Sequence, residues 1–178
     1  MTEAAIKMQN TNTTIVKGTI SYPLSASEAF KLGIGVRTAI MNVYASLAEK
    51  CSTNNDRAVI NNVVTQDQEK IATLEKEFDF ALNCEVGRFY AAGGTLLETD
   101  EMARKISNTS QLIQRNLDNC SAHISSLTKE AHTTSDSQEI MTLASRINEY
   151  VKDMYLRLAQ FYPQGEIRRA FQYMADIG

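Results

Sequence analysis

The chain has 178 residues, of which 43% are hydrophobic and 22% charged, proportions that suit one globular domain with a sizeable core. A net charge of −3 provides no positive field to hold nucleic acid or an anionic membrane, so neither is expected as a partner. Only 8 glycines and 2 prolines occur, too few for a fold of short strands and turns. The sequence has no long apolar run and its first 22 residues lack a secretory core, so a cytoplasmic location is expected.

Thiol and imidazole groups are few and scattered. The three cysteines stand far apart with no C-x-x-C pair, which argues against a disulfide framework and a structural zinc site. His123 and His132 are nine residues apart, so they do not form the i, i+4 pair that binds zinc on a helix. Cys120 and His123 share a helix face, and a nucleophile–base pair there is a minor alternative to ordinary surface residues.

Residues 1–22 form a polar arm that we expect to be extended or flexible, and residues 23–178 form a helical bundle. The first helical hairpin is expected over 25–84. Ser25 and Glu28 form a capping box that starts its first helix, which continues to about Cys51. Asp56 is expected to cap the second helix, and the break at Gly87 to Gly94 ends the hairpin.

A crossover over 85–136 contains an additional helix at about 100–131, marked by apolar residues at helical spacing. The second hairpin is expected over 137–178, capped near Asp136. Its last helix begins at Glu166 and has only about 13 residues, so it is short for the bundle that it completes.

The sequence matches itself at a constant offset of 111, when residues 28–67 are laid on 139–178. Identical pairs include Leu32 with Leu143, Tyr44 with Tyr155, Leu47 with Leu158 and Arg57 with Arg168. Apolar type is also kept in register through both helices and the turn between them. The pattern indicates a duplicated helical hairpin joined by one long crossover, although two unrelated amphipathic hairpins can also look alike at helical period.

Each repeat contains Tyr-x-x-Leu-Ala, at Tyr44–Ala48 and at Tyr155–Ala159. This phrase resembles the first and third helices of rubrerythrin-like members of the ferritin-like superfamily, where such a tyrosine lies two turns after a metal-binding glutamate. The resemblance implies an all-α, ferritin-like four-helix bundle of two hairpins. It also implies four inward carboxylates and two histidines around a pair of iron or manganese ions.

In this sequence the positions that match those ligands are largely replaced. Seven residues before the two tyrosines stand Arg37, a fixed cation, and Asn148, a poor ligand. The glutamates of the partner helices correspond to Asp67 and Gly178, and the one histidine position that the chain reaches is Lys70. We therefore expect Arg37, Asp67, Asn148 and Lys70 to form an ion pair or small polar network where metals would lie.

The leading interpretation is a ferritin-like bundle without a complete dimetal site, acting as a structural, assembly or interaction module. We expect no catalytic residue, metal or cofactor. We do expect the protein to form a homo-oligomer or to bind a protein partner. One alternative is an iron or manganese oxidoreductase of ferroxidase or peroxidase type, whose ligands have moved to Asp67, Glu69, Glu75 and Glu149. A second alternative is an unrelated all-helical adaptor.

Overall fold

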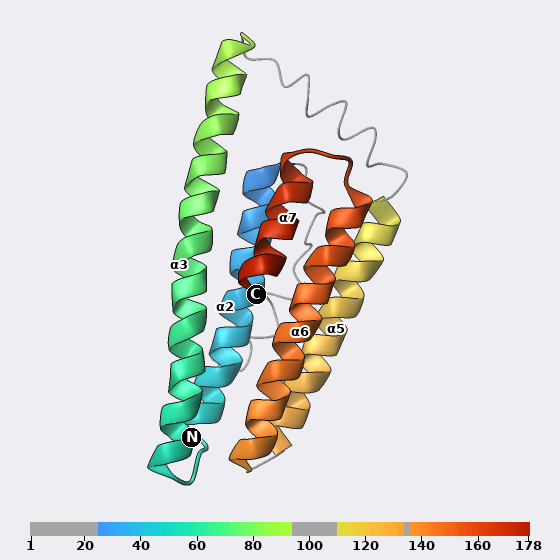
Figure 1. Ribbon diagram of the computed structural model, residues 1–178. Coiled ribbons are helices and arrows are strands. Elements are labelled where there is room, and N and C mark those ends of the chain that lie inside the picture. The colour runs from blue at the N-terminus through green and yellow to red at the C-terminus, as the bar shows by residue number, and fades with distance from the viewer. Residues whose placement is uncertain (1–24, 94–109, 134–135) are drawn as a thin grey trace, which may run out of the picture.

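The computed structural model describes residues 25–93, 110–133 and 136–178, and every regular element among them is a helix (Figure 1). The elements follow in chain order as α2 (Ala26–Ala48), α3 (Asn54–Ala91), α5 (Ser110–Thr133), α6 (Ser137–Phe161) and α7 (Glu166–Ile177). The all-helical class expected from the sequence is confirmed for this part of the chain. The arm at 1–22 and the start of the crossover helix at 100–109 lie outside the described residues.

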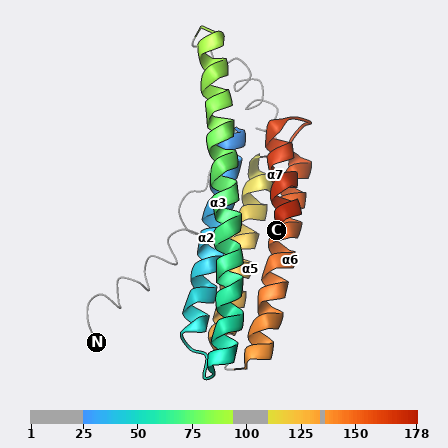
Figure 2. The ribbon, with the colours of Figure 1, turned by 60° about the vertical axis from the view of Figure 1, so that its left-hand side comes forward.

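Two antiparallel hairpins make up most of the bundle. Figures 1 and 2 show α2 beside α3, and α6 beside both α5 and α7. The early part of α2 also packs against α7, so the two hairpins meet along their sides. None of the described helices combines the length and the apolar character needed to cross a membrane.

The helix starts follow local capping rules. Ser25 accepts a hydrogen bond from the Glu28 N–H, as the capping box predicts, and Asp136 accepts one from the Gln138 N–H. The prediction for α3 was wrong by three residues. Thr53, not Asp56, is the cap, because Thr53 has extended backbone and its hydroxyl accepts from the Asp56 N–H. Asp56 lies in the first turn, where its charge favours the helix dipole.

The expected end of the first hairpin at 84, with a break from Gly87, was also wrong. Helix α3 runs through Gly87 to Ala91 and stops where Gly93 takes a φ of 66°. A single glycine in a helix costs only about 1 kcal/mol, which a long packed helix tolerates. The left-handed backbone at Gly93 is a much stronger stop signal, since other residues disfavour it. The crossover therefore begins after α3 rather than at 85.

Apolar side chains from all five helices meet in one continuous core. Its largest fully buried members include Tyr44, Leu47, Ile60, Tyr155 and Phe171. Two charged side chains are buried with them, Arg37 and Asp67. Because an isolated charge is very costly in such surroundings, the contacts of these two residues identify the unusual part of the core.

Candidate functional site

Arg37 lies in the middle of the bundle with 1% of its surface exposed. Its Nη1 donates to Asp67 Oδ1 at 3.3 Å and to Asn148 Oδ1 at 2.9 Å. The three residues come from α2, α3 and α6, so one guanidinium joins both hairpins. The structure brings together the three residues that the sequence predicted would form a polar network.

Lys70 and Gly178 extend this network toward α7. Lys70 Nζ donates to the Gly178 carbonyl oxygen at 3.0 Å, which links α3 to the end of α7. Gly178 is also close to Arg37, because a Cβ built on it would lie 2.7 Å from Arg37 Nη2. Lys70 and Gly178, the other two positions that match metal ligands in the resemblance, therefore also lie beside the buried Arg37 guanidinium.

The network combines two cations with one carboxylate. Burial raises the pKa of the Asp67 carboxyl, while the nearby Arg37 and Lys70 charges act against that rise. Burial lowers the pKa of the Lys70 ammonium, and the Arg37 charge lowers it further. Within the described part of the chain, Arg37 Nη2 and Asp67 Oδ2 make no hydrogen bond. The site is therefore a partly satisfied polar cluster around one buried guanidinium.

Two tyrosines cross-link the hairpins beside this network. Tyr44 of α2 donates to the Ala144 carbonyl of α6 at 3.1 Å, and Tyr155 of α6 donates to the Gly33 carbonyl of α2 at 3.5 Å. Both tyrosines and both acceptors are related by the offset of 111 that relates Arg37 to Asn148. Burial raises the pKa of each phenol well above its usual range, so both remain protonated donors.

The displaced ligands of the oxidoreductase alternative are not gathered into a site. Glu69, Glu75 and Glu149 are all exposed, whereas Asp67 is buried. Among the described residues there is no group of three or more histidine, cysteine, aspartate or glutamate side chains placed to hold a metal. The carboxylates that this alternative needs therefore do not converge.

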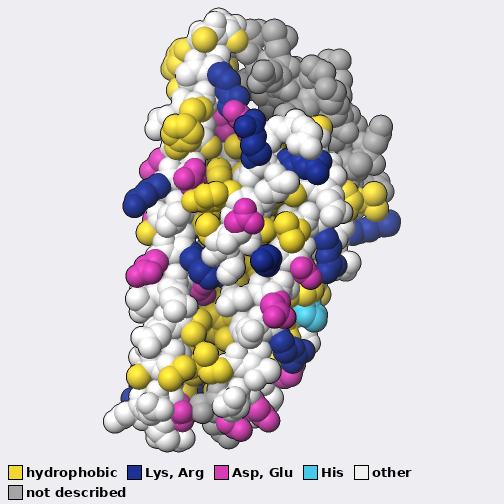
Figure 3. Space-filling view, in the orientation of Figure 1, with side chains coloured by type: hydrophobic (Ala, Val, Ile, Leu, Met, Phe, Trp, Pro, Cys, Tyr) yellow, Lys and Arg dark blue, Asp and Glu magenta, His cyan; other side chains and the backbone are white. Residues whose placement is uncertain are grey.

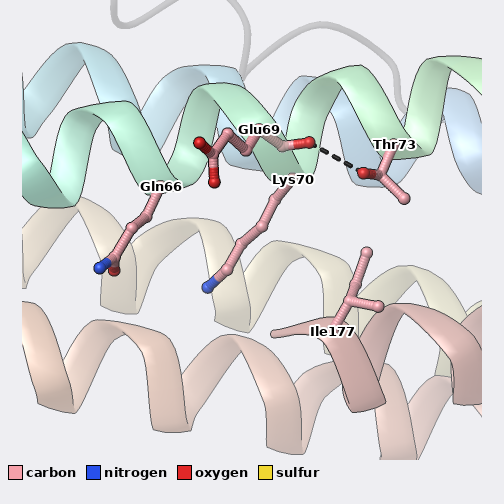
Figure 4. Close-up of a pocket in the computed structure, with 5 residues that line it drawn as sticks. All are labelled: Gln66, Glu69, Lys70, Thr73 and Ile177. Atoms are coloured by element: carbon pink, nitrogen blue, oxygen red, sulfur yellow. Dashed lines mark hydrogen bonds between the residues drawn. The ribbon is translucent and has the colours of Figure 1, made fainter.

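Glu69 instead borders a shallow groove of about 300 Å³ between α3 and the end of α7, lined by Gln66, Glu69, Lys70, Thr73 and Ile177. Figure 4 shows Gln66 and Lys70 projecting from α3 toward the C-terminal hairpin, while Ile177 enters the gap from α7. The Thr73 hydroxyl donates a hydrogen bond to the Glu69 carbonyl oxygen of the same helix. Lys70 is thus the residue that connects the groove to the buried network.

The structure does not support Cys120 as the nucleophile of a Cys120–His123 pair. Cys120 is buried, and burial raises the pKa of its thiol to about 12, so almost no thiolate forms near neutral pH. The exposed His123 ring lies against Tyr150, with ring centroids 4.1 Å apart. His123 therefore contributes to the contact between α5 and α6. The side chain of His132 lies outside the described residues.

The N-terminus of α2 has a second cap, contributed by α3, that no sequence pattern indicates. The Glu85 carboxylate accepts from the Ser27 N–H at 2.9 Å and from the Ser27 hydroxyl at 2.6 Å, so α3 closes the N-terminus of α2. No local pattern reveals this pair, because the residues are 58 positions apart. The last turns of α3, beyond the predicted end at 84, expose the apolar residues Phe89 and Tyr90.

Comparison with known proteins adds no relative, since no family model, curated protein or solved structure matches this chain.

Proposed function

We propose that this protein is a ferritin-like helical bundle without a complete dimetal site, and that it works as a structural, assembly or interaction module. The observation that carries the proposal is the Arg37 guanidinium, which donates to both Asp67 and Asn148 in the centre of the bundle. These residues stand at three of the positions where the resemblance implies metal ligands.

A fixed cation is incompatible with the metal pair that the resemblance implies. A divalent ion 4 Å from a guanidinium would be repelled by about 8 kcal/mol at an effective dielectric constant of about 20. Arginine cannot relieve this repulsion by losing its proton. In this proposal the guanidinium and its partners take the space that the resemblance assigns to two metal ions. The protein accordingly contributes surface and shape rather than redox chemistry.

The reciprocal tyrosine bonds support the ferritin-like connectivity within this proposal. The Tyr44 hydroxyl donates to the Ala144 carbonyl oxygen, and the Tyr155 hydroxyl donates to the Gly33 carbonyl oxygen. The two hydrogen bonds join equivalent positions of the repeat. Two unrelated amphipathic hairpins would share apolar spacing but have no reason to share these polar contacts. The cross-links therefore favour duplication of one hairpin about an axis near Arg37 and Asn148.

A gain-of-function experiment tests the proposal. The triple variant Arg37→Glu, Lys70→His and Asn148→Glu, together with the native Asp67, would place four potential ligands in the core. We expect it to bind Co²⁺ with visible absorption bands and to gain thermal stability with the metal. The unmodified protein should contain no stoichiometric iron or manganese and should not oxidise added ferrous iron.

The matched control replaces the same three residues by glutamine, which removes both cations without supplying ligands and should bind no Co²⁺. Stoichiometric iron or manganese in the unmodified protein would overturn the proposal. A folded triple variant that binds no metal would show that these positions do not derive from a dimetal site.

A further inference from the structure

Lys70 differs in its surroundings from the other lysines in the described part of the chain. Six lysines lie in that part, and the five others are exposed: Lys31, Lys50, Lys76, Lys129 and Lys152. Lys70 is half-buried, and its side chain extends from α3 toward the end of α7 (Figure 4). Figure 3 shows Lys and Arg side chains spread among acidic ones over the face that carries α3, α6 and α7. The local setting of Lys70, rather than a basic patch, therefore distinguishes it.

The amino group of Lys70 lies where the buried network meets open space. Toward α7, Nζ donates to the Gly178 carbonyl oxygen at 3.0 Å, which fixes the end of the side chain. Lys70 also lines the groove of about 300 Å³, whose acidic border is Glu69. A groove of this volume is at the lower end of the range for small-molecule sites. A small reagent can therefore reach an amine that is already positioned.

The charges around Lys70 favour the unprotonated amine, which is the nucleophilic form of a lysine. Burial lowers the pKa of the Lys70 ammonium, the Arg37 charge lowers it further, and the Asp67 charge opposes both. Arg37 belongs to α2 and keeps its proton, so its effect is built into the core. The neighbouring parts of α6 and α7 contribute uncharged groups to this cluster, the Asn148 amide and the Gly178 carbonyl.

We propose that Lys70 is a modification site, and that its amine in the groove takes an acyl group from small acyl thioesters. Nζ attacks the thioester carbonyl carbon, so that an N–C bond forms and the C–S bond breaks. The nitrogen loses one proton and the departing thiolate takes up one, which leaves an amide on Lys70 and a free thiol. The attacking amine can keep its hydrogen bond to Gly178 through one N–H while its lone pair faces the groove. This modification goes beyond the proposed function.

Acylation of Lys70 changes how α3 holds the end of α7. The amide carries no charge and has a single N–H, so the bond to the Gly178 carbonyl loses its charge assistance. Lys70→Gln imitates the neutral product. We expect faster hydrogen exchange at the end of α7 in this variant, whereas Lys76→Gln, on the exposed side of the same helix, should leave that exchange unchanged. Equal exchange in the two variants would contradict this consequence.

The test is competition between lysines within the full chain. The probe is the acetyl thioester of N-acetylcysteamine, and mass spectrometry measures the acetylation rate of each lysine. We expect Lys70 to react several-fold faster than the exposed Lys76. Between about pH 6 and about pH 9 the ratio of the two rates should fall as pH rises, because Lys70 approaches full deprotonation first while an ordinary lysine continues to gain neutral amine up to about pH 10.4.

Two variants with opposite effects test the physical cause. Arg37→Gln removes the cation that disfavours the ammonium, so the ratio of the Lys70 rate to the Lys76 rate should fall. Asp67→Asn removes the carboxylate that favours the ammonium, so the same ratio should rise. Loss of the fold would instead bring both variants to a ratio near that of two ordinary lysines. The matched control is Arg157→Gln, at an exposed ion pair, which should leave the ratio unchanged.

Acetylation of Lys70 at the rate of Lys76, or more slowly, would overturn this inference. A faster rate at Lys70 that is unaffected by Arg37→Gln and Asp67→Asn would overturn it as well, since the buried cluster would then play no part in the reaction. None of these results bears on the metal experiments, so the modification site can fail while the proposed module stands, and the reverse also holds.

Discussion

Arg37 shows how one residue can set the character of a protein core. Its guanidinium is 1% exposed and holds Asp67 and Asn148 together across three helices. Replacing Arg37 by methionine keeps a long side chain but leaves the Asp67 carboxyl without its cation. We expect a loss of about 3–5 kcal/mol in the free energy of unfolding, measured by urea denaturation, because the variant leaves an uncompensated buried charge.

The control for this prediction is the exposed pair of Arg157 and Asp153, whose atoms are 3.8 Å apart. Arg157→Met should change the free energy of unfolding by no more than about 1 kcal/mol, since water screens an exposed pair. If Arg37→Met cost no more than this control, the buried network would not contribute to the stability of the bundle.

At the scale of elements, the packing of α2 on α7 depends on one glycine. A Cβ added to Gly33 would collide with the Met174 side chain, whereas a Cβ added to Gly35 would meet nothing within 4 Å. Both glycines lie inside α2. Alanine improves helix propensity at either position by about 1 kcal/mol, but at Gly33 overpacking opposes this gain by about 1–3 kcal/mol.

We therefore expect Gly35→Ala to raise the melting temperature and Gly33→Ala to lower it or leave it unchanged. Thermal unfolding followed by circular dichroism compares two chemically identical changes two residues apart. Equal stabilisation by both would mean that α7 does not approach α2 closely at Gly33.

At the scale of the whole molecule, the two tyrosine cross-links hold one hairpin to the other. Tyr44→Phe and Tyr155→Phe each remove a single buried hydrogen bond, at 3.1 Å and 3.5 Å. Each change should cost about 1 kcal/mol in the free energy of unfolding, and the double change should cost about the sum, because the bonds share no partner atom. Strongly unequal costs would argue against the symmetric roles that the repeat implies.

Much of this molecule could be predicted from local and periodic features of its sequence. Apolar spacing gave the helical class, the capping residues Ser25 and Asp136 marked two helix starts, and the offset of 111 matched Tyr44 with Tyr155. Arg37, Asp67 and Asn148 were expected together because they stand at ligand positions that the ferritin-like resemblance implies, and an error of one residue in register would have rotated a side chain by 100° around its helix.

Other features were decided only by tertiary structure. The Ser27–Glu85 cap and the close approach of Met174 to Gly33 both involve residues that are distant in sequence. Which atoms of the Arg37 network remain without a hydrogen bond also depends on how the helices pack. Helix α3 continues through Gly87, since one glycine costs only about 1 kcal/mol, and it ends where Gly93 takes a positive φ. Sequence fixes what is local or periodic, while contacts between helices depend on which faces meet and how closely, and only the assembled bundle determines those distances.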